Sequence, residues 1–185
     1  MTKFYFLRHG QTDWNLEGRC QGHSDITLND TGIKQAKKAV NLLNGVDIDL
    51  IISSPLLRAL QSASIISEAI NKPLHIDSQT KERSFGSFEG EITYKIKEAH
   101  NISKEESITN ILPENAEQWH ETLERSNAAI NKNLNKYGDK TLLFVSHGAF
   151  FRAMHENLTG KHMEAENAQP YLFEKTNEQW DIKIL

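Results

Sequence analysis

The sequence FYFLRHGQT, residues 4–12, joins an apolar run to an arginine, a histidine and a glycine. The aromatic and aliphatic residues predict a strand of a buried sheet, and Gly10 permits the sharp turn that ends it. In open α/β sheets, ligands bind at the carboxyl ends of parallel strands. Arg8 and His9 would therefore form a cationic corner with a potential nucleophile. The pair alone is equally compatible with a solvated strand end.

A second stretch repeats this pattern near the other end of the chain. Residues 141–148, TLLFVSHG, again join an apolar run to a histidine, His147, and a glycine. Between the two, the apolar residues 49–53 predict a strand, and a helix is expected from about residue 56 to 70. Arg58 lies in the first turn of that helix, where a cation opposes the helix dipole. Its position is favourable if an anion binds there, although a surface charge is the ordinary interpretation of an arginine.

The remaining elements predict an α/β fold with a mainly parallel sheet flanked by helices on both faces. The polar loop 11–30 is expected to be ordered, anchored by Trp14 and Leu16, and to line a site. Helix 115–137 should bury one face, and residues 92–113 are weakly patterned, with one or two short helices. The other expected elements are helix 30–44, strand 74–76, irregular segment 81–90, strand 142–146, helix 149–158 and a hairpin of strands 171–173 and 180–182. The face of helix 115–137 that we expect to be buried carries Trp119, Leu123, Ile130 and Leu134.

Length and composition limit the class of protein. The 185 residues suit a single domain, 1–185, with 38% hydrophobic and 25% charged residues. The net charge of −4 makes nucleic acid an unexpected partner, so an anion site must be a local basic pocket. The single cysteine, Cys20, excludes an intrachain disulfide and a cysteine-based zinc site, and fits a reducing cytoplasm. We expect neither a signal peptide nor a membrane span.

Four cationic or potentially cationic side chains would meet at one edge of a parallel sheet, namely Arg8, His9, Arg58 and His147. They would repel one another unless they held an anion, and the arginine fork suits the oxygens of a phosphoryl group. One histidine can be a neutral nucleophile while the other donates hydrogen bonds. The eight histidines show no metal-binding spacing, so we expect no metal. His23 and His155 are further candidates for the border of the pocket.

Four motifs in the same order resemble the histidine phosphatase superfamily, in its phosphoglycerate mutase-like branch. They are LRHGQT at 7–12 with Trp14 and Asn15, SSPLLRA at 53–59, ERSFGSFEG at 82–90, and VSHG at 145–148. The resemblance spans residues 3 to about 155. In size and in the FGSFEG signature, α-ribazole phosphatase and the broad-specificity phosphatases look most similar.

The resemblance implies a role for each matching residue. His9 would be the nucleophile and would form a phosphohistidine, while Arg8, Arg58 and His147 would hold the phosphoryl oxygens. Glu82 would be the general acid and then the base that activates water. The pocket would also be lined by Asn15, Gln21, Gly22 and the amide of Gly148. Neither a metal nor an organic cofactor is implied.

The short insertion at about 91–117, called the cap below, favours hydrolysis over transfer. True mutases of this kind are longer and enclose the substrate, and excluding water protects the phosphorylated intermediate. We therefore expect a phosphatase for a small phosphorylated metabolite. A phosphoglycerate mutase, a phosphoprotein phosphatase and a non-catalytic phosphate sensor are alternatives. Departures from the family pattern at residues 25–28, 62 and 113–117 leave the core chemistry intact, and the last affects any substrate contact from the start of helix 115–137.

Overall fold

A six-stranded sheet organises the structure, a computed structural model that describes residues 2–185. The strand order is β3-β2-β4-β1-β5-β6. The pairings of β3, β2, β4 and β1 are parallel, whereas β5 and β6 form an antiparallel hairpin at one edge. The strands are β1 (Lys3–Arg8), β2 (Leu50–Ser53), β3 (Leu74–Ile76), β4 (Leu142–Ser146), β5 (Pro170–Thr176) and β6 (Gln179–Ile184). The predicted mainly parallel α/β sheet is confirmed.

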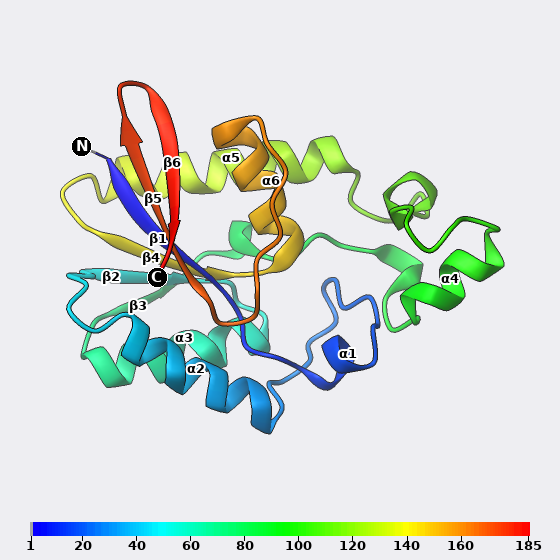
Figure 1. Cartoon of the computed structure of the whole chain (residues 1–185), viewed down its shortest axis with the longest axis horizontal. Helices are drawn as coiled ribbons and strands as arrows, with labels where there is room; N and C mark the ends of the chain where they lie inside the picture. The colour runs from blue at the N-terminus through cyan, green and yellow to red at the C-terminus, as the bar shows by residue number, and fades with distance from the viewer. Residues whose placement is uncertain (1) are drawn as a thin grey trace.

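Helices cover both faces of the sheet (Figure 1). Helices α2 (Asp30–Leu42) and α3 (Leu57–Ile70) lie on one face, and α5 (Trp119–Lys136) and α6 (Gly148–Thr159) lie on the other. Because side chains alternate along a strand, Phe4 and Phe6 pack with α5 and α6, while Tyr5 and Leu7 pack with α2 and α3. Two apolar cores therefore hold β1 and fix the position of its carboxyl end.

The loop between β1 and α2 is ordered but not fully irregular. It contains one helical turn, α1 (Asp13–Leu16), which Thr12 caps by accepting a hydrogen bond from the Asn15 amide. The prediction that Leu16 anchors the loop is wrong, because this residue is 73% exposed. Polar contacts hold the loop instead: the Thr12 hydroxyl donates to Oε1 of Gln21 over 3.0 Å.

Helix α5 begins at Trp119, later than the predicted residue 115. The residues before it contact another loop: the Asn115 side chain accepts from the Ser87 amide, and the Glu117 amide donates to the Ser84 carbonyl. The predicted buried face is also shifted. Of the four residues expected there only Ile130 is fully buried, beside Thr122, Ser126, Ala129 and Asn133. Apolar periodicity does not detect a face built from small and polar residues.

The cap lies beyond the end of the sheet, on the same side of the molecule as α1 (Figure 1). It contains helix α4 (Thr93–Ala99) and the 3₁₀ helix η3 (Ile108–Ile111), as the sequence indicated. Two further 3₁₀ turns, η1 (Ser78–Thr80) and η2 (Gly86–Phe88), lie in the segment that leads to it. Among residues 2–185 we find no helix with the length and apolar character that a membrane crossing requires.

Candidate active site

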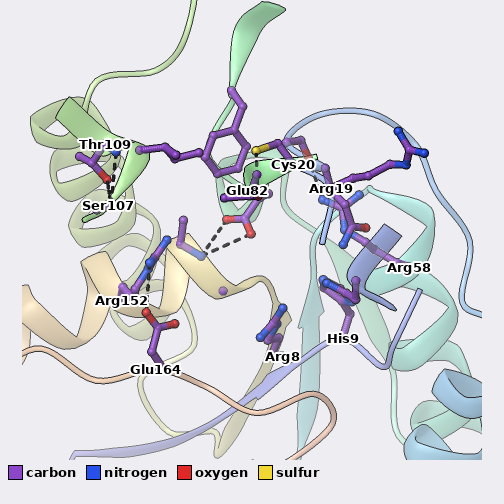
Figure 2. Close-up of a pocket in the computed structure, with 18 of the residues that line it drawn as sticks. Arg8, His9, Arg19, Cys20, Arg58, Glu82, Ser107, Thr109, Arg152 and Glu164 are labelled. Atoms are coloured by element: carbon purple, nitrogen blue, oxygen red, sulfur yellow. Dashed lines mark hydrogen bonds and ion pairs between the residues drawn. The ribbon is translucent and has the colours of Figure 1, made fainter. Parts of the chain in front are cut away.

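The ends of β1, β2 and β4 meet beside one cavity of about 310 Å³. Figure 2 shows Arg8, His9 and Arg58 close together at one end of it. His147 is fully buried and does not line the cavity, but its ring centroid lies 5.2 Å from that of His9. The other predicted site residues, Asn15, Gln21, Gly22, Glu82 and Gly148, all line the cavity. The structure thus brings the predicted residues together, while their roles remain predictions.

His9 is held in one orientation by its own turn. Its Nδ1 lies 2.7 Å from the Gly10 carbonyl, which can only accept, so Nδ1 carries the hydrogen and Nε2 carries the lone pair. Burial, followed by the charges of Arg58 and Arg8, lowers the pKa of His9 well below its ordinary value. The imidazole is therefore neutral at neutral pH, the form in which a histidine can act as a nucleophile.

His147 follows β4 and has a different partner. Its Nε2 lies 2.7 Å from the hydroxyl of Ser54, and its Nδ1 is buried without a hydrogen bond. Burial, the charge of Arg58 and the neighbouring His9 lower its pKa well below the ordinary value. Its unpaired ring nitrogen is therefore the atom that can interact with a ligand.

Backbone carbonyls hold the side chains of Arg8 and Arg58, and each guanidinium retains an unused donor. Arg58 donates to the carbonyls of Gly22 and Ser24 over 2.7 and 2.9 Å, and Arg8 donates to that of Ala165 over 2.9 Å. In each, Nε is buried without a partner. Burial lowers the pKa of Arg58 to about 10, so it remains charged at neutral pH. Unpaired buried donors are unfavourable, and a tetrahedral anion supplies the acceptors that they lack.

Glu82 reaches the cavity from another direction, across from His9 (Figure 2). Its Oε1 accepts from the amides of Arg83, Ala149 and Phe150 at 3.0, 3.0 and 3.2 Å. Two of these amides belong to the first turn of α6, where negative charge is favoured. Its Oε2 has only a longer contact of 3.3 Å with the Ala149 amide. Oε2 is therefore the oxygen that is free to exchange a proton.

Glu89, to which the sequence analysis gave no function, holds two segments of the site together. Its carboxylate accepts from the amides of His23, Ser24 and Phe85 and from two serine hydroxyls. These hydrogen bonds hold its pKa below the ordinary value despite partial burial. A Cβ on Gly22, whose φ is +51°, would lie 2.2 Å from this carboxylate. Glu89 thus ties the loop after β1 to the segment that carries Glu82.

The other two histidine candidates lie outside the cavity lining. His23 is exposed, and its Nε2 lies 2.9 Å from the Glu82 carbonyl. His155 is buried in α6, where Nδ1 lies 2.7 Å from the Lys161 carbonyl. His23 can therefore affect the position of Glu82, whereas His155 is a packing residue.

Paired histidines and arginines at one edge of a parallel sheet define an α/β protein with a phosphoryl-sized anion site. The sequence matches the model of the histidine phosphatase superfamily, branch 1, over residues 4–184. The chain belongs to this family.

Individual relatives agree over nearly the whole chain. The uncharacterized phosphatase PhoE of Bacillus subtilis is 35% identical, with 99% of this chain and 93% of that protein covered. A putative α-ribazole-5′-P phosphatase from Escherichia coli K-12 shares the fold, with a TM-score of 0.86, 24% identity and coverage of 100% and 95%. A phosphoserine phosphatase from Entamoeba histolytica, solved with 3-phosphoglyceric acid, has a TM-score of 0.83, 26% identity and coverage of 100% and 96%.

Proposed function

We propose that this protein is a phosphatase that hydrolyses a small phosphorylated metabolite through a phosphohistidine on His9. The observation that carries the proposal is the set of unpaired nitrogens around His9 Nε2. Nε of Arg8, Nε of Arg58 and Nδ1 of His147 are buried without a hydrogen-bond partner, and the two arginine nitrogens are donors. They are the groups required to hold phosphoryl oxygens and to stabilise the charge of a transition state.

The proposed reaction gives each of these groups a role. Nε2 of His9 attacks phosphorus, the P–O bond of the ester breaks, and Glu82 gives its proton to the leaving oxygen. Glu82 then takes a proton from water, whose oxygen attacks the phosphohistidine and releases inorganic phosphate. The enzyme returns to its starting state with both side chains as before, and no step requires a metal.

Hydrolysis is favoured over transfer to a second substrate by the size of the cap. One short helix and one 3₁₀ helix provide little chain with which to enclose a bound intermediate. Water therefore reaches the phosphohistidine, and exclusion of water is what a mutase needs. Supply of 3-phosphoglycerate with a 2,3-bisphosphate primer separates the two functions, because a mutase interconverts the esters faster than it releases phosphate.

The wider setting of the enzyme is part of the same proposal. Residues 1–185 act as a single domain, with 91–117 as the cap over the substrate. A cytoplasmic location is supported by the single cysteine, Cys20, which suits a reducing compartment.

Release of phosphate from p-nitrophenyl phosphate tests the proposal. We expect His9→Ala to abolish turnover, and the matched variant His120→Ala, at an exposed histidine, to retain it. Turnover by His9→Ala at the wild-type rate would remove His9 from its role. Activity should also persist in the presence of a chelator, and its loss would contradict the metal-free reaction.

A further inference from the structure

The end of the cavity opposite His9 contains an arginine that the proposed reaction does not use. Arg152 lies one turn after Gly148 on α6 and lines the same cavity. Figure 2 shows Arg152 and Glu164 on one side, with His9 and Arg58 on the other. The Arg152 Nη1 donates to Oε1 of Glu164 over 3.1 Å, and its Nε is buried without a partner. Part of this guanidinium is therefore unused.

The charges at this end do not balance. Lys97, from α4 of the cap, also lines the cavity, and its Nζ donates to the neutral carbonyl of Lys104. At this end Arg152 and Lys97 are opposed by the carboxylate of Glu164, which leaves one positive charge. Glu82, the other carboxyl group in the lining, carries the proton that the proposed reaction transfers, so it adds no negative charge when the substrate binds. At the other end Arg8 and Arg58 match the two charges of a phosphoryl dianion. Arg19 also lines the cavity, but its charge is paired with that of Glu17, which does not line it.

The position of the Arg152 side chain is fixed by packing. Its guanidinium carbon lies 5.9 Å from the centre of the Trp119 ring, at a distance typical of a cation–π contact. The Arg83 guanidinium lies 5.4 Å from the same ring. Two guanidinium groups therefore lie against the Trp119 ring. A planar carboxylate suits a guanidinium because two parallel hydrogen bonds can form.

We propose that Arg152 is a specificity-determining residue that, with Lys97, binds a carboxylate of the substrate. The substrates would then be small phosphomonoesters that also carry one acid group. A carboxylate supplies the single negative charge that this end lacks, whereas a second phosphoryl group would bring two. This inference rests on the proposed phosphatase function, because it assumes that the phosphoryl group occupies the end near His9.

A matched pair of esters tests the inference. 3-Phosphoglycerate and glycerol 3-phosphate differ only in a carboxylate against a hydroxymethyl group. We expect the wild type to favour the acid in kcat/KM, and Arg152→Gln to lower that preference by about tenfold or more, since a charged hydrogen bond is lost. Arg152→Lys should retain part of the preference. Glu164→Gln should raise it, because a competing negative charge is removed, and this rise is not expected of a residue with a purely structural role.

The control is Lys37→Gln, which removes one positive charge from the exposed face of α2 and should leave the preference unchanged. The inference is overturned if the wild type has the same kcat/KM for both esters, or if Arg152→Gln lowers kcat/KM for both esters by the same factor. So does a fall in preference in Glu164→Gln. Failure of the proposed function has a different signature, because the wild type would then release no phosphate from p-nitrophenyl phosphate.

Discussion

The hydroxyl of Ser54 lies 2.7 Å from Nε2 of His147, and both residues are fully buried. The Ser54 hydroxyl accepts a hydrogen bond from the Leu56 amide. Within residues 2–185, Nε2 of His147 is the acceptor to which this hydroxyl can donate its own hydrogen. Ser54 therefore donates to Nε2, which places the hydrogen of the neutral ring on Nδ1. Ser54 is in this way a positioning residue that orients a donor of His147 toward the phosphoryl group.

Replacement of Ser54 by alanine should lower kcat/KM by about tenfold, since the tautomer that donates to the substrate is no longer fixed. Long-range proton–nitrogen spectra of the imidazole rings provide the readout that a structural role would not change. We expect His147 to carry its hydrogen on Nδ1 in the wild type. In Ser54→Ala we expect a mixture of the two tautomers of this ring.

Ser53→Ala is the matched control, because Ser53 is equally buried and donates to the Ser54 carbonyl rather than to His147. It should retain both activity and tautomer. A wild-type His147 that carries its hydrogen on Nε2 would show that Ser54 does not act in this way.

Glu82→Gln should impair natural alkyl phosphates more than p-nitrophenyl phosphate. An amide cannot supply the proton that an alkoxide leaving group requires, whereas p-nitrophenolate leaves without one, and general acids contribute about 10²–10⁴-fold. The measurement is kcat/KM for glycerol 3-phosphate and for p-nitrophenyl phosphate with both enzymes. Equal losses on the two esters would assign the proton to another group.

Glu89→Gln should destabilise the protein by about 2 kcal/mol, because the amides of His23, Ser24 and Phe85 lose a charged acceptor. The Michaelis constant should rise as well, since the loop after β1 is released. Urea unfolding and steady-state kinetics measure the two effects. The control is Glu91→Gln, at an exposed side chain, and a similar effect of both variants would contradict the bracing role.

Stability should fall as the pH is lowered below about 6.5, the value of histidine in an unfolded chain. The pKa of His9 is lower in the folded state, so the unfolded state binds a proton first. The free energy of unfolding is thus highest above that pH and is lost as the pH falls, by up to about 1.4 kcal/mol per pH unit for each such group. Urea unfolding at several pH values between 8 and 5.5 gives the free energy of unfolding as a function of pH. This free energy should fall less steeply with decreasing pH for His9→Gln than for the wild type or His120→Gln. Identical slopes would refute the assignment.

Much of the fold could be predicted because its signals are local. The apolar runs that end at Arg8 and His147 define β1 and β4, and the parallel arrangement brings those ends together. Arg58 was predicted from its place in the first turn of the expected helix 56–70, and the family resemblance added Glu82. Each element buries its own apolar face, so the spacing of its apolar residues can be recognised from the sequence alone.

Other features depend on contacts between distant segments and could not be predicted. The bond from Ser54 to His147 joins residues 93 positions apart, and the bonds from Glu82 to the start of α6 join residues 67 and 68 positions apart. The start of α5 was misplaced because residues 115–117 bind residues 84–87 instead of extending the helix. Arg152 carries no motif, and only its place on α6 brings it into the cavity.

The most direct test of the central claim is to locate the phosphoryl group on the enzyme during turnover. Rapid quenching with ³²P-labelled p-nitrophenyl phosphate, followed by trypsin at alkaline pH, separates His9, in the peptide 9–19, from His147, in the peptide 141–152. We predict an acid-labile, alkali-stable label on peptide 9–19 that forms and decays at rates matching turnover. Turnover without any labelled peptide, or a label on peptide 141–152 alone, would contradict the proposed nucleophile.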